Sequence, residues 1–402
     1  MPTYEIAGRQ ILILAILVLY VGTFISRHFP FLRRNNIPES VTGGLICSVL
    51  ITALAGYEVV DLNFNLDLRN ILLLIFFSTI GLNAKLKFLL RGGLALLALT
   101  ISCGVFLIFQ NGIGVAVAKS LGYNPVFGLF GGSIALAGGH GTAVAWGDIM
   151  AGTGVEGVAE FGIACATFGL IVGGLFGGPL AGLLIKRHNL QPSEADLEEA
   201  EAIQGDSTGV PHHRVTVDDI IFTIFCLAIC LGFGDAVNRY LFEYNIRLPG
   251  FLTAMLVGVI LTNLADTCKI ELNHEGIDLI GGVCLQLFLA MSLMSMDLLS
   301  LADSFLLLGT TMVFQAVFAM LFGFLVVFRL MGSDYDAAMI VGGFFGLGLG
   351  ATPVAIANID AVAKKHGPSV RALLIVPLVG AFFIDIVNAV TIQIFLKLPI
   401  FH

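Results

Sequence analysis

One carboxylate lies inside the last long apolar stretch of this 402-residue chain. Asp385 is surrounded by apolar residues from Phe382 to Val387, and Asn388 follows three positions later, on the same face of a helix. Because a charge is costly to bury in such surroundings, this carboxylate is a functional candidate by default. Asp385 is suited to hold a sodium ion, the ammonium group of a substrate or backbone amides. A structural hydrogen bond is the alternative.

Two glycine-rich stretches offer a second kind of chemistry. Their central parts are 137–142 and 345–353, and each contains one threonine, Thr142 and Thr352. Each glycine costs a helix interior about 1 kcal/mol, so the clusters predict breaks in helices. A broken helix presents free N–H groups to an anion and free carbonyl oxygens to a hard cation. Close helix packing by small residues is the alternative.

These features predict two sets of binding residues. The expected substrate-binding residues are Gly138, Gly139, His140, Gly141, Thr142, Gly348, Gly350, Thr352, Asp385 and Asn388. Sodium is expected near Thr142, Thr167, Gly346, Thr352, Asn358 and Asp385, mostly on backbone carbonyls. His140 either donates to a carboxylate or carries a proton, or it makes a structural hydrogen bond. The threonine hydroxyls either bind a ligand or donate to a carbonyl one turn back. Bonds between helices are expected for Gln110, Asn111 and Gln315.

The composition places these residues in a membrane. The chain is 57% hydrophobic and only 12% charged, with a mean hydropathy of +0.96. That charged share is about half of what soluble domains carry. Long apolar runs, rather than short alternating segments, exclude an outer-membrane barrel. The seven cysteines form no Cys-x-x-Cys pair, and no basic patch suits nucleic acid. An all-α integral membrane protein is therefore expected, without cofactor, zinc, disulfide or nucleic acid.

The apolar runs predict ten membrane crossings of about 20 residues each. They lie near 11–26, 41–57, 70–84, 93–118, 158–185, 218–238, 250–265, 277–296, 304–328 and 370–396. The glycine-rich stretches near 126–148 and 337–360 are unsuited to an ordinary crossing. Irregular backbone is tolerated at membrane depth only where protein buries it or water lines it. Both stretches are therefore predicted to be re-entrant hairpins.

Loop charge predicts the orientation, because Lys and Arg prefer the cytoplasmic side. With the amino terminus outside, 14 of the 20 basic residues face the cytoplasm. The acidic segment 189–217 then lies inside and separates an amino-terminal half, 1–188, from a carboxyl-terminal half, 218–402. Its charged, proline-containing composition suits a solvated linker.

The two halves are similar at an offset of about 210 residues. The stretches 131–145 and 341–355 share five of fifteen residues, and Pro38 and Pro249 open corresponding spans. Five crossings in each half would make the second half run upside down. Paired glycine-interrupted segments in inverted halves are typical of a transporter's binding site. The sequence thus predicts two inverted five-helix repeats whose hairpins meet near the middle of the membrane.

Together these segments resemble the bacterial sodium:glutamate symporter family over essentially the whole chain. The resemblance rests on residues 37–39, 77–83, 138–142, 164–170, 346–353, 355–358 and 380–389. It implies import of L-glutamate with sodium as the coupling ion, across the bacterial inner membrane. It also implies a homodimer in contact with membrane lipid, in which transport domains move against a scaffold.

Three rival functions are weighed against this one. A related transporter would carry aspartate or citrate-like acids, coupled to sodium or to protons through His140 or Asp385. An intramembrane enzyme is disfavoured because the sequence holds neither a His-Glu-x-x-His motif nor a second deep aspartate. A channel is disfavoured because inverted hairpins suit alternating access better than a fixed pore.

Overall fold

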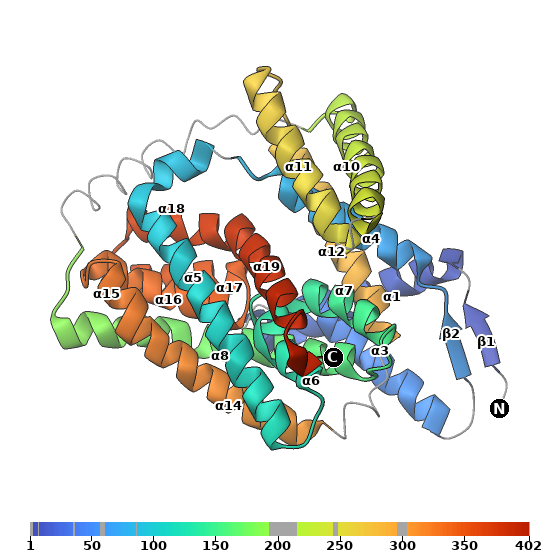
Figure 1. Cartoon of the computed structure of the whole chain (residues 1–402), viewed down its shortest axis with the longest axis horizontal. Helices are drawn as coiled ribbons and strands as arrows, with labels where there is room; N and C mark the ends of the chain where they lie inside the picture. The colour runs from blue at the N-terminus through green and yellow to red at the C-terminus, as the bar shows by residue number, and fades with distance from the viewer. Residues whose placement is uncertain are drawn as a thin grey trace. The chain divides into compact units, whose positions relative to one another are not determined.

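The computed structural model describes residues 3–6, 8–34, 37–56, 61–85, 87–192, 215–243, 248–295 and 304–401. Within these ranges the chain is almost entirely helical (Figure 1). It divides into two compact units, each assembled from separate parts of the sequence. Unit 1 comprises 1–86, 144–160 and 214–303, and unit 2 comprises 87–143, 161–213 and 304–402.

Unit 1 holds the first helices of each half of the chain. Its elements are β1 (Thr3–Ile6), α1 (Gly8–His28), α2 (Pro30–Arg34), α3 (Glu39–Gly56), β2 (Asp61–Phe64), α4 (Asp67–Leu82), α10 (Val217–Glu243), α11 (Gly250–Thr267) and α12 (His274–Met294). The later part of α7 (Gly139–Ala151) and the first residues of α8 (Val158–His188) also belong to it. Helix α4 packs against α10, α11 and α12, and α3 packs against α1 and α12. Glycines permit close approach: a Cβ on Gly81 of α4 would overlap the Met255 carbonyl of α11.

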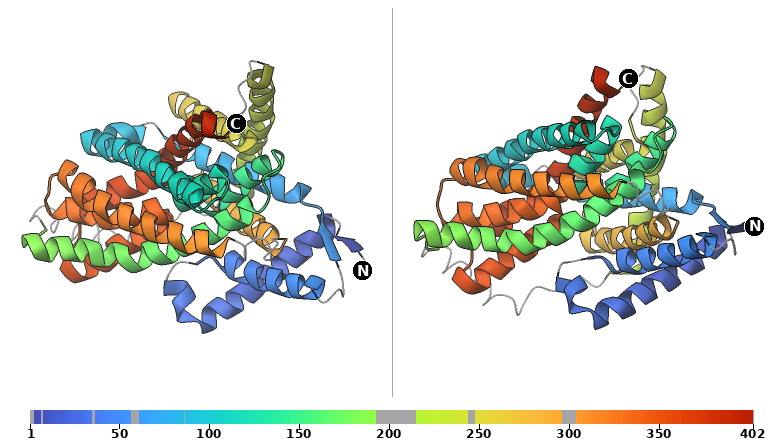
Figure 2. Two further views of the ribbon diagram at one scale, coloured as in Figure 1. Left: turned by 60° about the horizontal axis from the view of Figure 1, so that its bottom comes forward. Right: turned by 90° about the horizontal axis from the view of Figure 1, so that it is seen from below.

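Unit 2 holds the second glycine-rich stretch, most of the first, up to residue 143, and the helices around them. From the first half of the chain it contains α5 (Lys87–Ser120), α6 (Pro125–Leu129), the π-helix η1 (Phe130–Ile134), the beginning of α7 (Gly139–Ala151) and most of α8 (Val158–His188). From the second half it contains α14 (Phe305–Phe322), α15 (Phe328–Leu330), α16 (Tyr335–Leu349), α17 (Thr352–His366), α18 (Val370–Leu378) and α19 (Ile384–Leu396). The π-helices η2 (Gly323–Val327) and η3 (Val379–Phe383) and the short 3-10 helix η4 (Pro399–Phe401) also belong to this half. Helices α5 and α14 pack against each other, and the right-hand view of Figure 2 shows them side by side.

Several helices of unit 2 begin at polar caps that the sequence supplies. The Asn124 side chain accepts a hydrogen bond from the Val126 amide, and Pro125 occupies the first turn of α6. Asp334 and Ser369 cap α16 and α18 in the same way. These caps fix the first turns of α6, α16 and α18, and so where each begins along the chain.

The expected crossings agree with the observed helices. Seven described helices are long and apolar enough to span a bilayer, namely α1, α5, α8, α10, α11, α12 and the continuous run from α14 to α15. The crossings predicted near 41–57 and 70–84 correspond to the shorter helices α3 and α4. The last one corresponds to α18, η3 and α19. The chain is therefore a multi-pass membrane protein.

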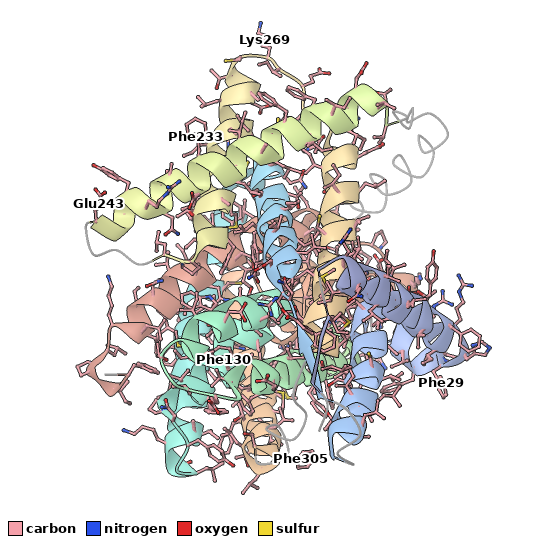
Figure 3. The ribbon with its side chains drawn as sticks, turned by 90° about the vertical axis from the view of Figure 1, so that its right-hand side faces the viewer. Phe29, Phe130, Phe233, Glu243, Lys269 and Phe305 are labelled. Carbon is pink, nitrogen blue, oxygen red and sulfur yellow. The ribbon has the colours of Figure 1, made fainter. Side chains whose placement is uncertain are left out.

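Apolar side chains on the outside of these helices fit a lipid environment. Phe233 of α10 and Phe305 at the beginning of α14 (Figure 3) are 63% and 70% exposed. In α5 the exposed apolar residues Leu94, Ile101 and Ile108 repeat every seven positions, which places them along one face. Such faces would be costly in water and are stabilised by lipid.

One small sheet was not predicted. Strands β1 and β2 pair in parallel, with Thr3 opposite Asp61 and Ile6 opposite Phe64. Four-residue strands are too short to show a reliable period in the sequence. The predicted acidic segment 189–217 lies mostly outside the described residues. Only 189–192 and 215–217 of this segment are described.

An ion pair in unit 1 gives a test of this packing. Arg69 of α4 donates to the Asp148 carboxylate of α7 at 2.5 Å, and its side chain is only 9% exposed. Asp148→Ala should lower the free energy of unfolding by about 1–3 kcal/mol, because it leaves a buried guanidinium without its anion. Asp235→Ala is the control, since the Arg239–Asp235 pair is 76% and 63% exposed and is worth at most about 1 kcal/mol. Equal thermal shifts in the two variants would contradict this assignment.

Candidate functional site

The second glycine-rich stretch is a pair of antiparallel helices broken at its tip. Helix α16 ends at Leu349 and α17 begins at Thr352, with Gly350 in a non-helical conformation between them. At the base of the pair the Tyr335 hydroxyl donates to the Gly367 carbonyl. Each helix has 15 residues and is therefore about 22 Å long, shorter than the roughly 30 Å of hydrocarbon in a bilayer.

The first glycine-rich stretch is broken twice. Gly132 inside η1 leaves the helical region with φ −111° and ψ −134°. The Gly138 amide then bonds to the Ser133 carbonyl at 3.0 Å. Gly139 follows with φ +71°, a conformation that favours glycine, and α7 starts there. The predicted break is therefore present at Gly138–Gly139, and a second one precedes it.

Helix α8 brings both breaks together within unit 2. A Cβ on Gly169 would overlap the Leu349 carbonyl oxygen, beside the second break. The same Cβ would lie 2.9 Å from Cδ2 of Leu136, beside the first break. A Cβ on Gly162 would come within 2.7 Å of Phe130, which precedes the first break in the sequence, and within 3.1 Å of Ala143, which follows it. Helix α8 therefore packs against both stretches, which lie about 210 residues apart in sequence.

His140 contacts α8 as well. Its Nε2 lies 2.9 Å from the Thr167 hydroxyl oxygen, and that hydroxyl donates to the Ile163 carbonyl at 2.9 Å. Because the Thr167 proton is already used, His140 donates through Nε2. A neutral His140 then keeps only an acceptor at Nδ1. The contact observed is the structural hydrogen bond, one of the two possibilities that the sequence left open.

Thr352 and Asn358 hold the second stretch in place. The Asn358 amide donates to the carbonyls of Gly173 on α8 and Gly342 on α16, at 3.0 and 3.2 Å. A Cβ on Gly380 in η3 would come within 2.6 Å of the Thr352 hydroxyl oxygen. Both side chains therefore lie in tight contacts at the predicted site, and the Asn358 nitrogen is used for structure.

Asn388 approaches the first stretch from α19. The Asn388 amide donates to the Ser133 carbonyl at 2.9 Å. Asp385, one turn earlier on the same helix face, is half-buried and makes no hydrogen bond or ion pair with any residue that the structure describes. A carboxylate without a protein partner in an apolar helix is available for a ligand.

Two buried glutamines link the breaks, a connection that the sequence did not reveal. Gln110 of α5 donates to the Gly348 carbonyl at 2.8 Å. Gln315 of α14 donates to the carbonyls of Gln110 and Gly131, at 2.8 and 3.0 Å. The prediction that these residues bond between helices is confirmed. The sequence does not indicate these partners. A polar residue in an apolar span can bond to any helix that packs against it, and the fold decides which helix that is.

An aromatic cluster packs behind the second break. The Phe106 ring of α5 lies 5.3 and 5.4 Å from the rings of Phe318 and Phe322, and 5.0 Å from that of Phe344. A Cβ on Gly348 would come within 2.8 Å of the Phe106 ring. This cluster fixes α16 against α5 and α14, and so fixes the carbonyls at its end.

Comparison with known proteins places the chain in a family. The model of the sodium/glutamate symporter family matches residues 4–368. The chain is 41% identical over 394 residues to the sodium/glutamate symporter of Escherichia coli K12, covering 97% of each protein. The chain belongs to the sodium/glutamate symporter family. Another relative with the same name, from Haemophilus influenzae, is 37% identical over 395 residues, or 98% of each protein.

Membership of the sodium/glutamate symporter family confirms the resemblance that the sequence indicated. The family consists of transporters rather than enzymes. The family match includes both broken stretches and ends at residue 368, before α18 and α19. Asp385 and Asn388 lie beyond the family match, which therefore does not bear on the roles predicted for them.

Proposed function

We propose that this protein imports L-glutamate together with sodium across the bacterial inner membrane. The observation that supports this most directly is the convergence of two broken helices on α8, in a chain of the sodium/glutamate symporter family. The amide ends of α7 and α17 are suited to a substrate carboxylate, because the first turn of a helix leaves its N–H groups unpaired. No cofactor is needed for this chemistry.

The proposed substrate site consists of the two break regions, Gly138–Thr142 and Gly348–Thr352. Sodium would bind to carbonyl and hydroxyl oxygens near Thr142, Thr167, Gly346, Thr352, Asn358 and Asp385. The freed carbonyls at a helix break are hard oxygen ligands of the kind that alkali cations prefer. Asp385 would add a negative charge close to these neutral oxygens.

We further propose that unit 2 is the transport domain and unit 1 the scaffold. Each half of the chain gives its first three predicted crossings to unit 1, and the broken part of its glycine-rich stretch with flanking helices to unit 2. This shared pattern supports two inverted repeats, with the glycine-rich stretches as re-entrant hairpins. Alternating exposure of unit 2 to the two sides would then carry the loaded site across. We also propose that the amino terminus lies on the outer side of the membrane and that the protein is a homodimer.

The electrical balance favours more than one sodium ion for each glutamate. Moving the single negative charge of glutamate into a cell-negative interior costs about 2.3 kcal/mol per 100 mV. One sodium ion cancels this term and leaves only its own concentration gradient. A second ion adds both an electrical and a concentration driving force, so we expect at least two.

Uptake of radiolabelled glutamate into proteoliposomes tests the proposed function. An inward sodium gradient should drive accumulation, and an inside-negative potential should increase it, because net positive charge moves inward. Equal uptake with and without the potential would contradict a coupling ratio above one. Uptake that follows a pH step rather than sodium, or that aspartate or citrate displaces more strongly than glutamate, would favour the related carboxylate transporter instead.

A further inference from the structure

Six buried polar side chains surround η1 in unit 2. They come from four elements and are each at most 2% exposed: Gln110 and Asn111 of α5, Ser133 of η1, Thr311 and Gln315 of α14, and Asn388 of α19. Figure 3 marks the place by Phe130, the first residue of η1. Hydrogen bonds to Gly131 and Ser133 join Asn111, Gln315 and Asn388 to η1, and a Cβ on Gly131 would lie 2.7 Å from Cγ2 of Thr311. We call the six residues the η1 polar cluster.

The amide orientations in the η1 polar cluster are fixed by their partners. Gln110, Gln315 and Asn388 each donate from the side-chain nitrogen to a backbone carbonyl. A carbonyl cannot donate, so the opposite orientation would place two acceptors together. The side-chain oxygens of these three residues therefore point elsewhere.

These oxygens lack partners, and two hydroxyls join them. Oε1 of Gln110, Oε1 of Gln315, Oδ1 of Asn388, Oγ of Ser133 and Oγ1 of Thr311 make no hydrogen bond to any described residue. Other buried hydroxyls in these helices, such as Ser102 and Thr391, donate to a carbonyl one turn back, which Thr311 does not do. The Asn111 amide is oriented by its Oδ1, which accepts from the Ser133 amide. Its Nδ2 donates to no described residue.

The surplus of oxygen in the cluster points to a cation. Leaving five buried oxygens unpaired would cost free energy comparable to the net stability of a domain. Neutral amide and hydroxyl oxygens suit a monovalent hard cation, whereas divalent ions take several carboxylates. Asp385 lies one turn from Asn388 on the same face of α19 and supplies a single negative charge nearby. We propose that the η1 polar cluster binds sodium.

This inference rests on the proposed function and deepens it. Gln315 bonds to Gly131, next to the break at Gly132 in the first stretch, and Gln110 bonds to Gly348 at the break of the second. A sodium ion among their oxygens holds the two breaks in one arrangement. Sodium bound there raises the affinity for glutamate, and glutamate raises the affinity for sodium by the same factor.

Thr311→Val tests the site, with Thr310→Val as the matched control. Valine keeps the shape of threonine and removes the hydroxyl. Thr310 is the preceding residue and lines an apolar groove on α14 together with Phe305 and Phe314. In purified full-length protein, NaCl should raise the melting temperature of the wild type and of Thr310→Val more than choline chloride does. Thr311→Val should lose this sodium-specific shift, and its half-saturating sodium concentration for uptake should rise about tenfold, the effect of losing one ligand.

The outcomes separate this site from a water-filled or merely structural cluster. If Thr311 is only an unpaired buried hydroxyl, Thr311→Val will be as stable as the wild type or more stable, with an unchanged sodium shift, and the proposal is overturned. If Thr311→Val does not fold, Ser133→Ala is compared with Ser120→Ala, an exposed serine at the end of α5. Wild-type protein that shows the sodium shift but no sodium-driven glutamate uptake would keep this site and refute the proposed function.

Discussion

Asp385→Asn is expected to abolish sodium-driven glutamate uptake while the protein remains folded. The change removes one negative charge and leaves the shape of the side chain almost unaltered. Because Asp385 has no protein partner among the described residues, none of the hydrogen bonds that the structure describes depends on its charge. A cation that binds near α19 loses its only nearby carboxylate on that helix face. We expect uptake to fall by about 100-fold or more, as when a buried charge loses its partner.

Asp360→Asn is the matched control for this prediction. Asp360 lies in the same unit, on α17, with an exposed side chain. The same loss of charge there should leave uptake within about twofold of the wild type, because exposed charges are strongly screened. Equal effects of the two substitutions would show that net charge matters and would remove Asp385 from the site. Melting temperature measured on both variants separates lost transport from lost folding.

Gly169→Ala is expected to have the second largest effect. The added methyl group would overlap the Leu349 carbonyl oxygen and press on Leu136, so α8 must move away from both breaks. Overpacking of this kind costs about 1–3 kcal/mol of stability. The cost to transport should be larger, because a displacement of about 1 Å in a binding geometry can reduce a rate about 100-fold.

Gly178→Ala, on the same helix, controls for the helix preference of alanine. A Cβ at Gly178 would have no atom nearer than 3.9 Å, so the substitution fits without movement. It should leave uptake unchanged and stabilise α8 slightly, since alanine favours helix over glycine by about 1 kcal/mol. Normal uptake in Gly169→Ala would mean that α8 does not hold the two breaks in their working positions.

The sequence predicted the helices well because hydropathy and glycine content are local properties. All ten expected crossings correspond to observed helices, although α3 and α4 are short and the last is interrupted by η3. The breaks at Gly138–Gly139 and Gly350 also lie where the glycine clusters indicated. The inverted relation of the two halves remains a prediction, supported by similarity at a fixed offset.

The site was only partly predictable. The sequence singled out His140, Thr167 and Asn358, but not that His140 bonds to Thr167 or that Asn358 is used to fix α17. The sequence does contain a pattern that includes Gly169. Gly162, Gly169, Gly173 and Gly177 recur at helical spacing along α8. Such a spacing shows that something approaches closely but does not identify it.

The sequence by itself determined a helical membrane protein with two broken segments, a carboxylate within an apolar helix and a family, because each follows from local composition or from matching strings. Only the tertiary structure decided that segments far apart in the chain form each unit, that α8 packs against both stretches, and that five oxygens around η1 have no partner among the described residues. The reason is physical. Which carbonyl an amide reaches, and which glycine faces which backbone, depends on how distant helices pack, and that is a property of the whole fold.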